Sequence, residues 1–214
     1  SLPFTYEKPN IEWHSMLVNF SNFGDNKEEM INSWLNAYDI IEPTLNLYFS
    51  TRSGVYKYLD GKFIALIQGL ETYHRRMSPD KLMPEEEYKA LVDKIMDGCP
   101  DANKEWLCGR LKHGNEINLA KRIKSIIEPF KEIFGNSKER SKFIRKAVDT
   151  RNYLTHYSED LKSSYPYPEE LWSLCDRMEI IYQLHFLQLI GFNEKMIGSI
   201  VSQNENFISR LRKI

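Results

Sequence analysis

The chain has 214 residues, enough for one domain of ordinary size with a substantial core. Its 29 lysines and arginines are nearly balanced by 30 aspartates and glutamates, so the overall charge gives no general attraction to nucleic acids or membranes. Any affinity for nucleic acid must come from a local cluster of basic residues.

The three cysteines form no CxxC pair, which is typical of reduced thiols in a cytoplasmic protein rather than of a disulfide framework. We therefore expect a cytoplasmic location. The most apolar stretch, residues 180–192, contains polar side chains and is shorter than the roughly 20 residues that cross a bilayer. It predicts a buried helix, and we expect no membrane partner.

The first 26 residues differ in character from the rest. Residues 1–26 are mixed in polarity and contain Pro3, Pro9 and Gly24, which predicts a connecting segment that packs on a neighbour. The chain begins at Ser1 without a methionine, and we expect an N-terminal domain of the full-length protein to precede it. The helical domain is expected to cover residues 27–214.

Helical periodicity begins near residue 27. Apolar residues spaced by threes and fours predict a helix over residues 28–49, with a bend at Pro43. A second helix is predicted over residues 62–76 and a third over about 84–97, which Gly98 ends. Further helices are predicted over residues 101–110, 115–134 (capped by Asn115), 137–156, 169–190 and 194–214, with an irregular loop over 157–168. Because no segment alternates as a strand would, we expect an all-α fold, a helical bundle.

The helix predicted over residues 137–156 ends in the sequence RNYLTH, which contains Arg151, Asn152 and His156. Histidine can take and give a proton near neutrality, and arginine is a permanent cation that suits a phosphate gaining charge. RNA cleavage without a metal needs such groups, because the 2′-hydroxyl requires a base, the 5′-oxygen an acid and the phosphorane a cation. One histidine cannot be acid and base at once, so two motifs in a homodimer would share one composite site.

The spacing on the helix is less simple than the motif suggests. At about 100° per residue, Arg151 and His156 lie roughly 140° apart, whereas Asn152 and His156 share one stripe. Asn152 is therefore expected to orient His156. Arg151 would reach the same groove from the edge of the stripe, or the helix would loosen near Thr155. A structural alternative is that Arg151 and His156 only cap the C-terminal end of the helix.

The RNYLTH segment on a helix of an all-α bundle resembles the signature of the HEPN superfamily, and the KFIALIQGLETYHRR helix resembles the corresponding helix of the Apea-like HEPN group. This resemblance implies a HEPN-like bundle with additional flanking helices that cleaves RNA without metal or cofactor. Arg151, Asn152 and His156 would be its catalytic residues. It also implies a dimer, a larger N-terminal domain, and a role in antiviral defence or a toxin system. Some HEPN bundles instead bind or dimerise without cleaving.

Six further residues are candidates for substrate binding. Glu71 and His74 lie within one turn of the second helix and would face the groove. Lys142, Arg145 and Lys146 precede the motif on its own helix, and such a track would hold phosphates beside the scissile bond. Alternatively, these basic side chains form a solvated face of that helix. Tyr157 follows His156 directly, so we do not assign it the modified tyrosine of one toxin branch, which stands two residues after the histidine.

Other sites are less well supported by the sequence. Cys99, Cys108, His113 and Cys175 lack the close pairs of a zinc site, and we expect no metal. The aromatic residues at core spacing favour packing over base stacking; they are Trp34, Tyr38, Trp106, Trp172 and Tyr182. The leading hypothesis is therefore an endoribonuclease with RNA as partner. The alternatives are a non-catalytic dimerisation or nucleotide- or RNA-binding module that regulates another domain, and a purely structural bundle.

Overall fold

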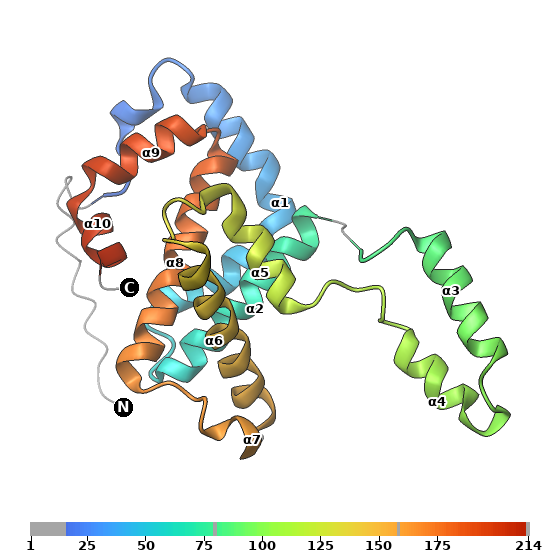
Figure 1. Ribbon diagram of the computed structural model, residues 1–214. Helices are drawn as coiled ribbons and strands as arrows, with labels where there is room; N and C mark the ends of the chain where they lie inside the picture. The colour runs from blue at the N-terminus through green and yellow to red at the C-terminus, as the bar shows by residue number, and fades with distance from the viewer. Residues whose placement is uncertain (1–15, 79–80, 158, 213–214) are drawn as a thin grey trace, which may run out of the picture.

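The computed structural model describes residues 16–78, 81–157 and 159–212. These residues form ten α-helices and two short 3-10 helices, with no strand among them (Figure 1). The expected all-α HEPN-like bundle is confirmed. Within the same described residues, no helix is long and apolar enough to cross a membrane.

The long helices run close to the predicted ranges. Their bounds are α1 (Lys27–Arg52), α2 (Leu59–Met77), α3 (Glu85–Asp97), α4 (Asp101–Leu111), α5 (Leu119–Ile127), α6 (Ser137–His156), α7 (Glu159–Lys162), α8 (Pro168–Ile190), α9 (Glu194–Gln203) and α10 (Glu205–Arg212). The 3-10 helices are η2 (Phe20–Phe23) and η3 (Glu128–Phe130). Helix α1 continues through Pro43, and the short α7 interrupts the loop predicted over 157–168.

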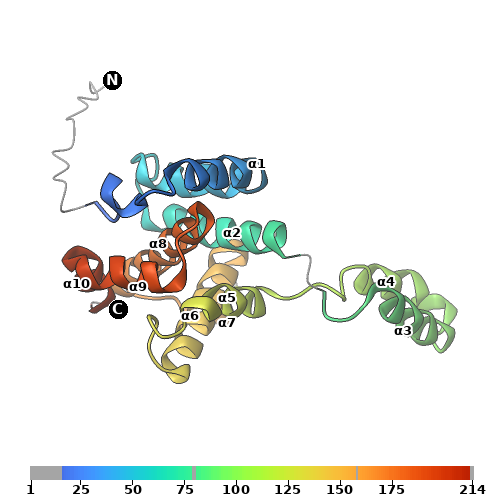
Figure 2. The same cartoon turned by 90° about the horizontal axis from the view of Figure 1, so that it is seen from above.

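Helix α8 lies at the centre of the body, with α1 and α2 packed against it (Figures 1 and 2). Tyr182 of α8 is fully buried and donates its hydroxyl hydrogen to the Leu66 carbonyl of α2 at 2.8 Å. A Cβ at Gly69 would collide with that hydroxyl, so the glycine allows α2 and α8 to approach closely. This contact fixes the helix that carries Glu71 and His74.

The helix predicted over residues 115–134 is wrong at both ends. Helix α5 begins at Leu119 because the Asn118 side chain accepts from the Lys121 backbone N–H at 3.0 Å. Asn115 instead bonds the backbone of Met83 in both directions, each at 3.0 Å. The α-helical hydrogen bonding ends before Pro129, which has no N–H to donate, and the chain continues as η3.

The single helix predicted over 194–214 is also wrong. Asn204 lies between α9 and α10 with an extended backbone and caps the second helix by accepting from the Phe207 N–H at 2.8 Å. In the segment predicted to connect domains, residues 1–15 lie outside the described residues. In the described part, the Phe23 and Phe192 rings lie 5.6 Å apart, so Phe23 packs on the body.

Helices α3 and α4 form a hairpin that stands away from the body in both views (Figures 1 and 2). Neither helix contains a buried residue.

The structure corrects the expectation that the five aromatic residues at core spacing all pack in the core. Trp34 packs against Phe186 and Tyr182 is buried, but Tyr38, Trp106 and Trp172 are exposed.

Candidate functional site

The predicted motif lies at the C-terminal end of α6. The helix begins at a capping box, in which Asn136 accepts from the Glu139 N–H at 3.0 Å and Glu139 accepts from the Asn136 N–H at 2.7 Å. Its buried residues recur every three or four positions and turn one face towards α2 and α5; they are Phe143, Ala147, Thr150 and Leu154. This spacing of the buried residues places Arg151 at the edge of the buried face.

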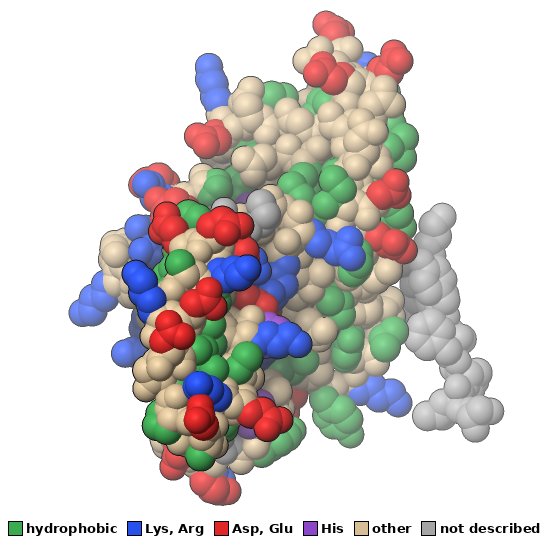
Figure 3. Space-filling view, turned by 90° about the vertical axis from the view of Figure 1, so that its right-hand side faces the viewer, with side chains coloured by type: hydrophobic (Ala, Val, Ile, Leu, Met, Phe, Trp, Pro, Cys, Tyr) green, Lys and Arg blue, Asp and Glu red, His purple; other side chains and the backbone are tan. Residues whose placement is uncertain are grey.

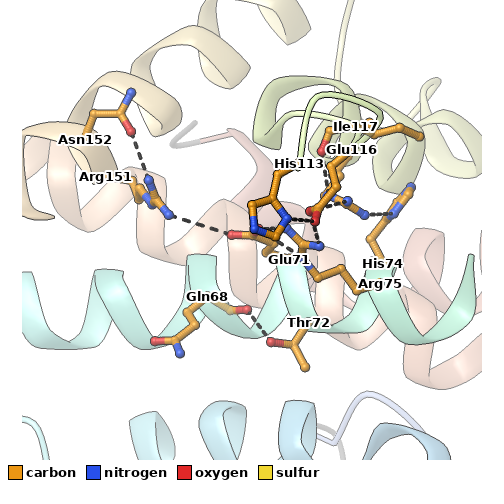
Figure 4. A network of polar contacts seen from close by, with 11 residues as sticks. Gln68, Glu71, Thr72, His74, Arg75, His113, Glu116, Ile117, Arg151 and Asn152 are labelled. Atoms are coloured by element: carbon orange, nitrogen blue, oxygen red, sulfur yellow. Dashed lines mark hydrogen bonds and ion pairs between the residues drawn. The ribbon is translucent and has the colours of Figure 1, made fainter. Parts of the chain in front are cut away.

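Arg151 is held by two neighbours. Its Nη1 donates to Asn152 Oδ1 at 3.2 Å, and its Nη2 lies 4.0 Å from Glu71 Oε2 on α2 (Figure 4). The Arg151 side chain remains 36 % exposed. Because an arginine carries five N–H donors, these contacts leave donors for an anionic ligand.

A cavity of about 450 Å³ lies beside Arg151, between α2, the start of α5 and α6. Its lining combines apolar and polar side chains. The lining residues are Ile64, Ile67, Gln68, Glu71, Thr72, Arg75, Leu119, Arg151 and Thr155. An arginine at the edge of a partly apolar cavity is suited to hold a phosphate while a base or sugar fills the space.

Glu71 is the first member of a chain of ion pairs. Arg75 donates from Nε and Nη2 to Glu71 Oε1, at 3.2 and 3.0 Å, and from Nη1 to Glu116 Oε2 at 2.6 Å (Figure 4). The hydrogen bond from Arg75 lowers the pKa of Glu116 below its ordinary value, and the same bond raises the pKa of Arg75. Arg75 therefore compensates the Glu71 charge and leaves one Glu71 oxygen directed to Arg151.

His74 lies beneath this network and is only 4 % exposed. Its Nδ1 is 3.2 Å from Nη1 of the buried Arg122, whose Nε donates to the Ile117 carbonyl at 2.9 Å. Arginine can only donate, so His74 Nδ1 accepts and the neutral imidazole carries its proton on Nε2. His74 is outside the residues that line the Arg151 cavity, and direct contact with substrate finds no support in this geometry. A positioning role remains a prediction.

His156 is the last residue of α6 and is exposed. The helix does not loosen before it, since α6 is continuous through His156, and the Thr155 hydroxyl donates to the Arg151 carbonyl at 2.7 Å. Arg151 and Thr155 line the cavity, whereas His156 does not. One chain thus brings together Arg151, Asn152 and Glu71, while His156, one turn after Asn152, lies outside the cavity lining.

Tyr157 closes α6 in the left-handed conformation, with φ of 49°, and its N–H donates to the Tyr153 carbonyl at 2.6 Å. Its exposed ring lies edge-on to Tyr153, at 5.6 Å between ring centroids. The backbone bend at Tyr157 ends the helix directly after His156, so the imidazole stands at the helix terminus.

The basic side chains upstream divide between two surroundings. Lys142 and Arg145 are exposed, whereas Lys146 lies 3.4 Å from Glu170 of α8. Lys142 and Lys146 also line a larger cavity of about 690 Å³ between α6 and α8, together with Glu139. These acids interrupt the predicted phosphate track on the side that faces α8.

The sequence analysis missed Arg75, Glu116 and Arg122. The spacing of Glu71 and Arg75 is the helical ion-pair spacing and offered a signal. No local pattern signals Glu116, because it lies far along the chain and is brought in by the return from α4.

The cysteines are dispersed, with Cys175 buried in α8 and Cys108 exposed on α4. Among the described residues, no group of three or more His, Cys, Asp or Glu could hold a metal ion.

In a comparison with protein-family models, the model described as Apea-like HEPN matches residues 64–196. This span runs from α2 into α9 and includes Glu71, Arg151, Asn152 and His156. No curated protein and no solved structure matches the chain.

Proposed function

The chain belongs to the Apea-like HEPN family, a membership that supports a nuclease or RNA-related role, and from this premise we propose that it is a metal-independent endoribonuclease. The observation that carries the proposal is Arg151, which lines the cavity, is partly exposed and is positioned by Asn152 and Glu71. We also propose that two copies of the chain form the active site together, since a single copy leaves His156 outside the cavity.

In the proposed reaction a neutral His156 takes the proton of the RNA 2′-hydroxyl, and the 2′-oxygen attacks the adjacent phosphorus. The bond from phosphorus to the 5′-oxygen breaks, and the protonated His156 of the other copy supplies the proton for that oxygen. Arg151 stabilises the charge that accumulates on the phosphorane oxygens. The products are a 2′,3′-cyclic phosphate and a 5′-hydroxyl, and no atom from a metal or cofactor enters the balance.

The charge distribution at the cavity supports phosphate binding. Glu71 faces Arg151 at 4.0 Å, a separation longer than a hydrogen bond, while Arg75 donates twice to its other oxygen. Glu71 therefore orients the guanidinium without occupying its donors. The exposed Lys142 and Arg145 would bind the adjoining phosphates, with Lys146 and Tyr157 as further candidate residues, while the buried His74 would act by positioning alone. A cytoplasmic role in antiviral defence or a toxin system is part of the same proposal.

The test is incubation of the purified chain with mixed RNA in excess chelator. We expect cleavage with 2′,3′-cyclic phosphate ends, and a loss of roughly 100-fold or more in Arg151→Ala and His156→Ala. Arg76→Ala is the matched control, because Arg76 is an exposed arginine outside the cavity that bonds the Ile40 carbonyl. Full activity in His156→Ala with unchanged helix content would refute the assignment.

The second candidate function is a non-catalytic dimerisation or nucleotide- or RNA-binding module that regulates another domain. The position of His156 outside the Arg151 cavity favours it, because binding of an anion needs only the arginine. This candidate gives intact RNA in the same assay. It also gives binding that Arg151→Ala weakens and His156→Ala leaves unchanged.

A further inference from the structure

The α3–α4 hairpin contributes nothing to the core of the body. Its helices have 13 and 11 residues and bury none of them, and the hydrophobic core of the described chain draws on neither helix. Helices of this length are marginal on their own in water and gain most of their stability by packing an apolar face. The hairpin therefore has apolar side chains that the monomer does not cover.

Three large apolar side chains are exposed on the two helices. Leu91 and Ile95 lie one turn apart on α3, and Trp106 on α4 is 62 % exposed. A shallow hollow of about 560 Å³ lies beside Trp106, and Gly109 leaves the surface there open. An exposed tryptophan beside a hollow is a common centre of protein interfaces.

The base of the hairpin is firmly built. Asn115 is buried and bonds the Met83 backbone in both directions, and Leu82 donates its N–H to the Asn115 carbonyl at 3.0 Å. Tyr88 donates its hydroxyl to the Leu111 carbonyl at 2.5 Å, in a space that only glycine at position 114 leaves open. These bonds hold the two ends of the hairpin together, and Glu116 joins this arm to Arg75 of α2.

This arm begins at the rim of the Arg151 cavity. Arg75 before the hairpin and Leu119 after it both line that cavity. Glu116, in the return from α4, connects through Arg75 and Glu71 to Arg151 (Figure 4). A molecule held by the hairpin would therefore lie next to the cavity.

The charges of the hairpin indicate what it holds. Residues 85–111 contain seven acidic side chains, all exposed, and four basic ones. Figure 3 shows acidic and apolar side chains, with basic ones between them, on this face of the molecule. Such a surface repels RNA phosphates. Helix α6 has the opposite balance, with six basic and two acidic side chains, in a chain whose net charge is −1. The hairpin and α6 are complementary surfaces.

We propose that the α3–α4 hairpin is the dimerisation arm of the protein and holds the α6 helix of a second copy. In a two-fold dimer each hairpin would hold the start of the other copy's α6, burying Leu91, Ile95 and Trp106 beside the exposed Lys138, so that Lys142 and Arg145 stay available to RNA. The second α6 then carries its His156 to the rim where the first copy presents Arg151. This inference rests on the proposed function, which requires two copies in one site.

The test compares two double variants of the full chain by sedimentation. Leu91→Ser with Trp106→Ser is expected to weaken dimerisation by at least about tenfold. Leu35→Ser with Phe49→Ser is the matched control, since both residues are more than half exposed on α1, away from the hairpin, and is expected to dimerise as the unchanged chain does. Circular dichroism checks that each variant keeps its helix content.

The outcomes separate this inference from the proposed function. A hairpin variant that still dimerises overturns the arm, while cleavage that depends on His156 leaves the nuclease intact. Weakened dimerisation in the α1 variant alone, or an unchanged chain that is monomeric at high concentration, also overturns the arm. Reversing charge with Asp93→Lys and Asp97→Lys gives a second reading, with weaker dimerisation expected and a smaller dependence on salt.

Discussion

The bundle around α8 and the α3–α4 hairpin are both helical, but they differ in how many of their side chains are buried. Helix α8 buries twelve of its 23 residues, whereas α3 and α4 bury none. Stability is therefore concentrated in the body, because burial of apolar surface is the dominant favourable term in folding. The hairpin leaves its apolar side chains for contacts with another molecule. Substitutions in the body should therefore lower stability, whereas substitutions in the hairpin should mainly weaken contacts with another molecule.

The largest effect is expected in the body. Phe63 of α2 is fully buried, and Phe63→Ala should lower the free energy of unfolding by about 3–5 kcal/mol, through lost burial and the cavity left behind. Urea denaturation followed by circular dichroism measures this change. A decrease below about 1 kcal/mol would mean that the core is less tightly packed than the structure shows.

A pH effect of up to about 3 kcal/mol is expected from His185 of α8. Burial lowers its pKa from 6.5 to about 4, while its Nε2 donates to the Ile126 carbonyl at 2.8 Å and Tyr73 donates to its Nδ1 at 3.2 Å. The unfolded chain takes up a proton in this range and the folded chain does not, so stability falls as the pH drops from about 6.5 to 4.

Denaturation at several pH values tests the sign of this effect. His185→Gln should remove the part of the pH dependence between pH 6.5 and 4, at a cost in stability near neutrality from the altered hydrogen bonds. An unchanged pH profile in this variant would show that other groups determine the acid sensitivity of the bundle.

The junction between body and hairpin should give an intermediate effect. Glu116→Gln removes the charge that holds Arg75, and we expect RNA cleavage to fall by up to about tenfold, or 1.4 kcal/mol, with dimerisation unchanged. Glu128→Gln is the control, because Glu128 also pairs with a cation, Lys131, but lies away from the cavity. Equal activities of the two variants would disconnect the ion-pair network from the site.

The smallest effect on stability is expected in the middle of the first hairpin helix, α3. Leu91→Ala changes an exposed side chain and should shift the free energy of unfolding of the monomer by no more than about 0.5 kcal/mol. Measurement at low protein concentration excludes dimer formation. A shift above about 1.5 kcal/mol would place Leu91 within the cooperative core and remove the contrast between the two regions.

Much of the fold was predictable, because amphipathic periodicity depends on burial along one face. The pattern over residues 62–76 predicted α2 to within three residues at its start. The predicted helix start was wrong where two neighbouring residues could each cap the helix. Asn115 and Asn118 are both good capping residues, and only the packing of the hairpin base assigns Asn115 to Met83 and Asn118 to α5.

The candidate site was predictable only in part. The placement of Arg151, Asn152 and His156 on one helix followed from their spacing, and Glu71 was a candidate from its turn of α2. The burial of His74 and the part played by Glu116 depend on tertiary contacts that join residues distant in sequence. The exposure of Trp106 was not predicted either, because core and interface helices have the same apolar periodicity.

Sharing of one active site by two copies can be measured by mixing subunits. Equal amounts of the unchanged chain and His156→Ala, after subunit exchange, should form about one quarter unchanged dimers, one half mixed dimers and one quarter mutant dimers. If each site needs both histidines, cleavage falls to about one quarter of that of the unchanged chain. A fall to only one half would show that each copy acts alone and would contradict the composite site.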